Sequence, residues 1–252
     1  MTSSARLRRI TEAVRASGGS TVADLAALTG ASEMTVRRDL DALAAQGVLE
    51  RYRGGARPLL LRGEEPPFTL RAQEGAEVKR RLAAEVVTLV ADGESVVLDS
   101  GTTCLEVARL LGTRRVTVMP LSLPAAAALA AGGRARVLLP GGDLRPGEQS
   151  LTGPLTEASL AALRFDTAVL GCCGLDPASG LTAYDLADAA VKRAAMRSAR
   201  RVVAVTEAAK LSRTALAAVA PVSDLHAVVT EAGAPETALA ELAAAGVTVS
   251  AV

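Results

Sequence analysis

Seven short apolar runs recur along the chain from residue 96 onward, and stretches with a helical pattern separate most of them. A strand of a parallel sheet reads as such a continuous apolar run, because helices cover both faces of the sheet. The alternation predicts an α/β domain over residues 76–252. In it, a helix at 78–90 comes before the strands of a mostly parallel sheet. The runs are 96–99, 116–119, 137–139, 167–171, 202–206, 227–230 and 247–252.

The first 57 residues have a different pattern and predict a separate domain. A first helical stretch ends near a glycine pair, and Thr21 with Asp24 has the spacing of a capping box that opens a second, short helix. Gly30 supplies a turn before a third helix, and residues 48–58 alternate apolar and basic side chains as in a small β-hairpin. This is the order of a winged helix-turn-helix. We expect a DNA-binding domain at 1–57 and a proline-containing linker at 58–75.

The third predicted helix, which begins after Ser32, carries polar side chains opposite an apolar stripe. Val36, Leu40 and Leu43 recur at i, i+4 and i+7 and form the face that packs on the other helices. A solvated polar face is the alternative for this helix alone, and a plain three-helix interaction module is the alternative for the domain. In a winged helix-turn-helix, however, the third helix enters the major groove and the wing reaches the DNA backbone. The predicted DNA contacts are Ser32, Glu33, Met34, Thr35, Arg37 and Arg38 on the helix, and Arg51 and Arg53 in the wing.

The positive charge of the chain is concentrated in this first domain. The net charge is +1, but residues 1–57 carry +3 and the rest of the chain carries −2. A basic module of this kind suits an anionic partner such as double-stranded DNA. A constitutive DNA-packaging protein is disfavoured, because the second domain is large and acidic.

Cysteine usage and the start of the chain indicate a reduced, cytoplasmic protein. Cys104, Cys172 and Cys173 form no metal-ligand spacing, and the adjacent pair could form a disulfide only with strain. No apolar stretch of a signal peptide follows the first residues. Prolines and glycines break the uncharged run at 116–133, which favours a strand, a turn and a helix over a membrane span. With no P-loop, zinc spacing or complete G-x-G-x-x-G, we expect no nucleotide or metal cofactor.

Polar residues gather at the ends of three predicted strands, where open α/β sheets bind their ligands. The first group opens a helix with hydroxyl groups and a glycine, which suits a phosphate, although an ordinary Ser/Thr helix cap is an equal alternative. The glycines of the other two groups could serve turns alone. The groups are Asp99, Ser100, Gly101, Thr102 and Thr103; then Gly142 and Arg145, leaving the strand at 137–139; then Gly171 and Gly174 in a glycine-rich turn with Asp176.

Lysine is rare in this chain, which has 25 Arg but only three Lys. A compact ammonium group can meet a phosphate or a hydroxyl where a guanidinium would not fit. Lys192 and Lys210 follow strand-end loops, and we predict that they contact a ligand, whereas Lys79 lies in the helix before the sheet. Surface lysines placed by chance are the alternative.

The stretch "TVADLAALTGASEMTVRRDLDALAAQGVLERYRGGA" closely resembles the DNA-binding domain of the DeoR family of bacterial transcriptional regulators. Its Ser-x-x-Thr-x-Arg-Arg-Asp-Leu helix and Gly-Gly-Ala wing end carry the resemblance, with Tyr52 where the family usually has His. The second domain resembles the family's sensor domain, a relative of ribose-5-phosphate isomerase and glucosamine-6-phosphate deaminase. The resemblance implies a repressor of carbohydrate metabolism with a phosphorylated sugar effector, its phosphate near residues 99–103 and Lys192 and Lys210 close by.

The second domain departs from the family at two strand ends. Pro120, Leu121 and Ser122 stand where Thr-Asn-Ser is common, and Glu207 opens a Glu-Ala-Ala-Lys run where Asp-Ser-Ser-Lys is common. These changes remove an amide and two hydroxyls that would contact a sugar, so the effector is expected to be atypical. Reading paired half-sites requires a homo-oligomer, at least a dimer.

The rival hypothesis is a sugar-phosphate isomerase with an appended DNA-binding head. Such an enzyme needs a placed general base. His226 enters a strand and reads as a core or strand-edge residue, while Asp176, Asp188 and Glu207 have no visible pairing. We therefore favour a regulator without catalytic residues.

Overall fold

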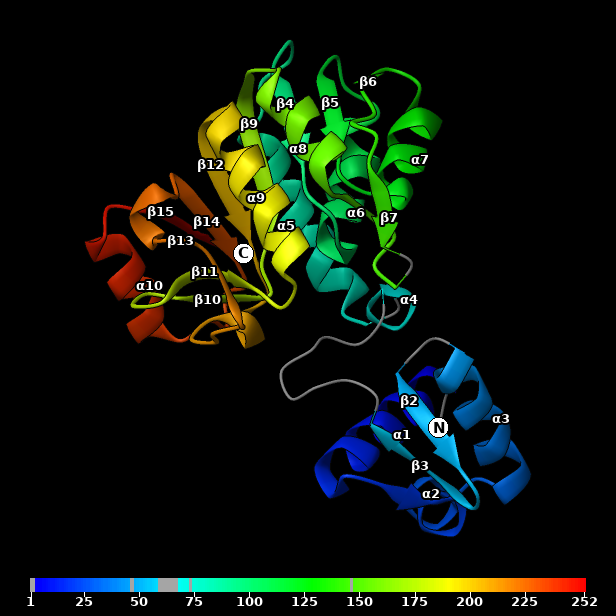
Figure 1. The fold of residues 1–252 in the computed structure, drawn as a ribbon. Helices are drawn as coiled ribbons and strands as arrows, with labels where there is room; N and C mark the ends of the chain where they lie inside the picture. Colours follow the sequence, from blue (N-terminus) through cyan, green and yellow to red (C-terminus); the bar gives the residue numbers. More distant parts are fainter. Residues whose placement is uncertain (1–2, 46–47, 59–67, 73, 146) are drawn as a thin grey trace. The chain divides into compact units, whose positions relative to one another are not determined.

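The protein is described here from a computed structural model that covers residues 3–45, 48–58, 68–72, 74–145 and 147–252. The chain divides into two compact units, Met1–Glu74 and Gly75–Val252 (Figure 1). Most of the linker expected at 58–75 lies outside the described residues. Phe68–Arg71, within it, forms a short helix, α4, in which Phe68 is buried.

Residues 3–58 of the first unit combine three helices with a small antiparallel sheet, as the sequence predicts. The capping box at the start of α2 is confirmed: Thr21 accepts from the Asp24 N–H, and the Asp24 side chain accepts from the Thr21 N–H. Gly30 ends the same helix in the left-handed conformation, with φ of 67°. The elements are α1 (Ser3–Ser17), β1 (Ser20–Thr21), α2 (Val22–Thr29), α3 (Glu33–Ala45), β2 (Leu49–Tyr52) and β3 (Gly55–Pro58), with sheet order β1-β3-β2. The short strand β1 was not predicted.

The predicted apolar stripe of α3 forms the centre of the first core. Val36, Leu40 and Leu43 are fully buried and pack with residues of α1 and α2. Arg6 on α1 donates twice to the Asp39 carboxylate on α3, through Nε and through Nη2 at 3.2 Å. This fixes the rotation of α3, so its opposite face points away from the core.

The second unit is built on a seven-stranded sheet, and each of the seven predicted apolar runs contributes one strand. The strand order is β15-β14-β12-β9-β4-β5-β6, and every pair is parallel. The strands are β4 (Ser95–Leu98), β5 (Thr117–Pro120), β6 (Arg136–Val137), β9 (Phe165–Gly171), β12 (Ala199–Val205), β14 (Ala227–Thr230) and β15 (Thr248–Ala251). The parallel α/β architecture is therefore confirmed.

Helices cover both faces of this sheet (Figure 1). One face packs on α5, α6 and α7, and the other packs on α8, α9 and α10. Side chains alternate accordingly: Val96 and Leu98 of β4 enter one core, and Val97 enters the other. The helices are α5 (Ala76–Thr88), α6 (Thr102–Leu111), α7 (Leu123–Gly132), α8 (Pro154–Ala161), α9 (Leu186–Ser198) and α10 (Glu236–Ala244), with short 3-10 turns η1 (Ala208–Lys210) and η2 (Val222–Asp224).

Two smaller sheets were not predicted. Strands β7 (Asp143–Arg145) and β8 (Ser150–Thr152) form a hairpin, so Arg145 lies within a strand and not in a loop leaving one. Strands β10 (Gly174–Asp176), β11 (Gly180–Ala183) and β13 (Ala217–Ala220) form an antiparallel sheet, so the glycine-rich turn is mostly strand.

The uncharged run at 116–133 folds as the sequence predicts, into β5 and then α7. None of the helices in the described ranges has the length and apolar content needed to span a membrane.

Candidate functional site

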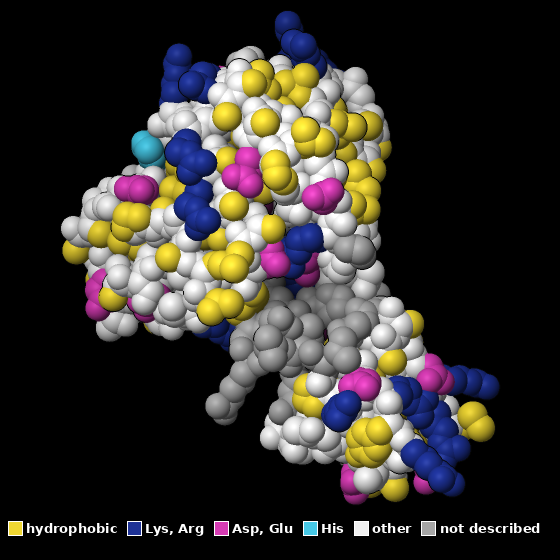
Figure 2. All heavy atoms as spheres, viewed as in Figure 1, with side chains coloured by type: hydrophobic (Ala, Val, Ile, Leu, Met, Phe, Trp, Pro, Cys, Tyr) yellow, Lys and Arg dark blue, Asp and Glu magenta, His cyan; other side chains and the backbone are white. Residues whose placement is uncertain are grey.

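The face of α3 opposite the first core is polar and exposed. Arg37 and Arg38 point outward from the middle of the helix, and Met34, in its first turn, is 58% exposed. Ser32 stands before the helix and accepts from the Thr35 N–H at 3.2 Å, which makes it the predicted N-cap. Figure 2 shows Lys and Arg side chains gathered over the α3 side of the first unit. The predicted helix residues therefore share one outward surface.

Two ion pairs divide the charges on this surface. Glu33 holds Arg37 at 3.1 Å, one turn later on α3. Arg51 on β2 donates to the Asp41 carboxylate of α3, which ties the wing to the helix. Arg38 and Arg53 are exposed and form no ion pair with any other side chain that the structure describes. They are the arginines of this surface best placed to meet phosphates or bases.

The end of the wing packs closely on the start of α2. Val22 donates its N–H to the Gly54 carbonyl at 2.9 Å, and the Tyr52 hydroxyl donates to the Ser20 carbonyl at 3.4 Å. A Cβ at Gly55 would lie 2.4 Å from the Ser20 carbonyl oxygen and 2.6 Å from the Tyr52 hydroxyl. Glycine at 55 is therefore required by space, and Tyr52 is part of the same contact.

In the second unit, the predicted residues Asp99, Gly171 and Lys192 come together at the carboxyl ends of β4 and β9. The Asp99 carboxylate accepts from the Gly171 N–H at 2.9 Å and from the Lys192 ammonium, and Lys192 also donates to the Gly171 carbonyl at 3.3 Å. Asp188, one turn earlier on α9, is 3.5 Å from the same ammonium. Lys192 is thus enclosed by two carboxylates.

Burial and charge act against each other in this group. Burial opposes the charged form of Lys192, but Asp188 and Asp99 outweigh it and raise the pKa of Lys192 well above its ordinary value. Burial raises the pKa of Asp99, and Lys192 opposes that rise. Lys192 is therefore a charged group that holds β4, β9 and α9 together.

The loop after Asp99 leads directly into α6. Gly101 precedes the helix with φ of 101° and ψ of 168°, a conformation that essentially only glycine adopts, and it provides no side-chain cap. Thr102 is buried, whereas Ser100 and Thr103 are half-exposed. The first N–H groups of a helix lack partners within the helix and attract anions, so this start of α6 has the chemistry of a phosphate site.

The two other lysines lie by neighbouring strand ends. Lys210 in η1 donates to the Cys172 carbonyl at 3.1 Å, directly after β9. Lys79 on α5 is buried 3.9 Å from Glu207, which follows β12. All three lysines of the chain therefore contact groups at the carboxyl ends of the parallel strands, although the partner of each is a different residue.

Cys104 and Cys172 are buried beside this group. Burial raises the pKa of the Cys172 thiol to about 12, and it raises the pKa of Cys104 still further. Both thiols are therefore protonated in the folded protein, and neither has the electrostatic setting of a nucleophile.

Sequence reasoning missed two partners of residues at the carboxyl ends of the strands, Ser150 and Asp185. Ser122 follows β5 and forms an isolated antiparallel bridge with Ser150 of β8, whose buried hydroxyl has no hydrogen-bond partner among the described residues. Arg145 of β7 is 3.9 Å from Asp185, the N-cap of α9. The Asp185 cap has a sequence signal, an acid three residues before Asp188, but the Ser122–Ser150 pairing joins distant segments.

Close packing accounts for two of the predicted glycines. A Cβ at Gly142 would lie 2.0 Å from the Thr156 hydroxyl, and a Cβ at Gly174 would lie 2.5 Å from the Arg213 carbonyl oxygen. Both glycines thus have structural reasons that need no ligand.

The groups considered for catalysis are engaged elsewhere. The Asp176 carboxylate accepts from the N–H groups of Ala178 and Ser179 in the turn between β10 and β11. His226 is exposed directly before β14, and its Nδ1 accepts from the Val202 N–H at 3.1 Å. Among the residues that the structure describes, no group of three His, Cys, Asp or Glu side chains could hold a metal ion.

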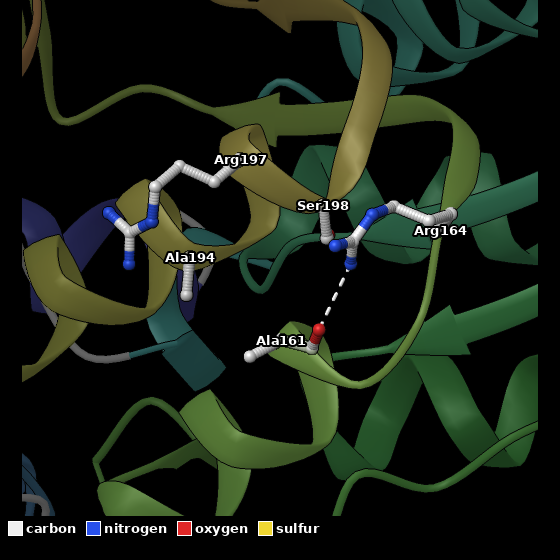
Figure 3. Close-up of a pocket in the computed structure, with 5 residues that line it drawn as sticks. All are labelled: Ala161, Arg164, Ala194, Arg197 and Ser198. Atoms are coloured by element: carbon white, nitrogen blue, oxygen red, sulfur yellow. Dashed lines mark hydrogen bonds between the residues drawn. The ribbon is translucent and has the colours of Figure 1, made fainter.

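A hollow between α8 and α9 lies at the amino ends of the parallel strands. Ala161, Arg164, Ala194, Arg197 and Ser198 line it (Figure 3). Arg164 donates to the Ala161 and Leu163 carbonyls at the end of α8. These helix ends lead into the amino ends of β9 and β12, away from the edge where α/β sheets bind ligands.

Comparison with known proteins gives the same two-part division. Residues 6–59 match the DeoR-like helix-turn-helix domain, and residues 74–232 match the DeoR C terminal sensor domain. The chain is 34% identical over 244 residues to the HTH-type transcriptional regulator GlpR of Haloferax volcanii, covering 97% of this chain and 96% of that protein. It is 30% identical over 227 residues to the glycerol-3-phosphate regulon repressor of Escherichia coli K12, covering 90% of each. Ribose 5-phosphate isomerase A of Methanocaldococcus jannaschii is similar over 55% of both chains, with 20% identity and a TM-score of 0.41.

Proposed function

We propose that this chain, which belongs to the DeoR family of transcriptional regulators, binds operator DNA through α3 and changes its operator affinity when a phosphorylated sugar or polyol occupies the carboxyl edge of its parallel sheet. The observation that carries the proposal is the uncapped start of α6, which stands at the end of β4 beside the Asp99–Lys192 pair.

The exposed surface of α3 supports the DNA-binding part. In a helix-turn-helix, the first residues of the third helix meet base edges while basic residues nearby meet phosphates. Met34, Arg38 and Arg53 are exposed and stand on the helix and the wing that would do this. Ser32 and Thr35 position the start of the helix. Arg37 and Arg51 contact the DNA backbone while they remain paired with Glu33 and Asp41.

The effector part assigns roles to the strand-end residues. Gly101 and Thr103 present backbone N–H groups to the phosphate, and Ser100 and Thr103 present hydroxyls, with Thr102 buried behind them. Lys210 and Arg145 border the site, and Lys192 acts through Asp99 by fixing the loop. The glycerol-3-phosphate regulon repressor, named for a phosphorylated polyol, supports this effector class.

We infer a sensor and not an isomerase. Asp188 is paired with Lys192, Glu207 lies near Lys79, and Asp176 is occupied in a turn. None of these three carboxylates therefore stands ready as a general base. The expected result is binding of phosphosugars without product formation, measured by calorimetry and by a coupled isomerase assay. Steady turnover lost on changing Asp188 or Glu207 would establish the enzyme instead.

We further infer a repressor that acts in the cytoplasm as a homo-oligomer. The relatives named above include a repressor with nearly the same length. One chain carries one helix-turn-helix, and a two-fold symmetric operator needs two. Sedimentation of the purified chain is expected to give at least a dimer. A chain that is monomeric at the concentrations at which it binds a full operator would contradict this.

The decisive experiment places an acid at the start of α6. Thr103→Asp is expected to abolish the effector response, because its carboxylate repels the phosphate, while operator affinity stays near the wild-type value. The matched control is Thr88→Asp at the exposed end of α5. By linkage, an effector shifts operator affinity only through different affinities for the free and DNA-bound protein, so Thr103→Asp behaves as a permanently unliganded regulator. A normal response by Thr103→Asp would place the ligand elsewhere.

A further inference from the structure

We propose that Met34 reads the C5-methyl group of a thymine in the operator. The proposal rests on the placement of α3 in the major groove and adds a base identity to it. Met34 is the exposed apolar side chain in the first turn of α3, the turn whose residues meet base edges in a helix-turn-helix.

The neighbours of Met34 are already engaged. Glu33 is paired with Arg37, and the hydroxyls of Ser32 and Thr35 lie 2.9 Å apart. On α3, Met34 and Arg38 are the large exposed side chains with no ion pair or hydrogen bond to any other residue that the structure describes. These two residues are therefore free to take their partners from the DNA.

The chemistry of each side chain selects a base. The thymine methyl is the apolar feature of the major groove, and guanine presents the two acceptors that an arginine fork binds. The methionine side chain is unbranched and polarisable, so it can follow the position of a methyl group. The apolar side chain of Met34 thus matches the thymine methyl, and the donors of Arg38 match the acceptors of guanine.

The spacing of the two residues predicts the spacing of the bases. Met34 and Arg38 are four residues apart, which is about 6 Å along a helix that rises about 1.5 Å per residue. Base pairs follow one another at about 3.4 Å. Each half-site is therefore expected to contain a thymine within about two base pairs of the guanine contacted by Arg38.

The test removes only the methyl group. An operator is first selected from random DNA with the full chain, and each thymine in it is then replaced singly by deoxyuridine. Fluorescence anisotropy gives the dissociation constant of each duplex. We expect one thymine in each half-site whose replacement weakens wild-type binding about fourfold, the equivalent of one buried methyl-sized group. Met34→Ala is expected to bind the thymine and uracil duplexes equally at that position.

Two variants provide controls. Leu28→Ala, which shortens an exposed apolar side chain on α2, is expected to keep the wild-type thymine-to-uracil ratio. Arg38→Ala is expected to weaken both duplexes and keep the same ratio.

The outcomes separate this inference from the function on which it rests. If Met34→Ala keeps the wild-type ratio at every position while Arg38→Ala loses specific binding, α3 reads the groove and the thymine contact is wrong. If neither variant affects binding, the assignment of α3 to the groove fails instead.

Discussion

Lys192 on α9 and Asp99 at the end of β4 form a buried ion pair, with side chains 3% and 2% exposed. Asp188 adds a second carboxylate at 3.5 Å, so the ammonium compensates two acids at once. Buried charges of this kind cost much free energy when one partner is removed, because the other remains desolvated and unpaired.

Lys192→Met is therefore expected to lower the free energy of unfolding of the sensor domain by about 3–5 kcal/mol. Differential scanning calorimetry of the full chain measures this, because the two units are expected to unfold in separate transitions. The double variant Lys192→Met, Asp99→Asn serves as the control and is expected to lose less than the single variant. A wild-type transition for Lys192→Met would mean that the pair contributes no stability.

Gly55→Ala is expected to destabilise the DNA-binding domain by about 1–3 kcal/mol, the range for overpacking. The added methyl would meet the Ser20 carbonyl oxygen, which belongs to the backbone and cannot move aside cheaply. Tyr52→Ala is expected not to rescue this variant, because removing the ring leaves the Ser20 clash. The midpoint of the calorimetric transition of the DNA-binding domain measures the stability of both variants. If Tyr52→Ala restored the stability of Gly55→Ala, the Tyr52 ring alone would be what the added methyl meets.

Arg51 and Arg53 provide a matched pair in the wing. Arg53→Ala is expected to reduce the slope of log K against log salt by about one unit, as for the loss of one phosphate contact. Arg51→Ala is expected to reduce it by less, since Asp41 already neutralises Arg51. Operator titrations at several salt concentrations give both slopes, and equal reductions would mean that Arg51 leaves Asp41 on binding DNA.

The lowered pKa of Asp166 leads us to expect that the stability of the protein depends on pH. Its carboxylate accepts from the Ser95 N–H at 2.9 Å and from the Ser95 hydroxyl at 2.7 Å, and these bonds lower the pKa of Asp166 below its ordinary value of 3.8. A lowered folded-state pKa contributes stability above the unfolded value, and this contribution is lost as the pH falls below about 3.8. Asp166→Asn is thus expected to be less stable than wild type at pH 6, with the difference shrinking toward pH 2. Because the side chain is 38% exposed, the effect is small. Denaturation across this pH range measures it, and a constant difference would exclude the linkage.

Local chemistry explains which parts of the fold could be predicted from sequence. The Thr21–Asp24 capping box and the Ser32 cap are contacts within four residues, and the seven strands of the main sheet are continuous apolar runs. The smaller sheets lack such signals. Their strands have three or four residues, and pairs such as Leu181 and Ala220 join segments far apart in the chain.

The same distinction applies to the site. The strand-end rule identified Asp99, Gly171 and Lys192, and the structure brings them together. It could not assign Asp99 as a partner of Lys192, because the two residues are 93 positions apart and an ion pair between distant segments leaves no periodic pattern in the sequence. Asp188, four residues before Lys192 on the same helix, does have the local i,i+4 spacing. Because these contacts engage its ammonium group, we propose that Lys192 positions the loop after Asp99 and does not itself contact the effector.

The enclosure of Lys192 also limits how this chain can change over evolutionary time. Arginine is by far the commoner basic residue in this chain, with 25 Arg against three Lys. At position 192, however, a compact ammonium group lies buried between two acids, a setting that differs in size and shape from what a planar guanidinium needs. Arginine is therefore not a conservative replacement for Lys192, and a change at Asp99, Asp188 or Lys192 alters the charge balance of the other two.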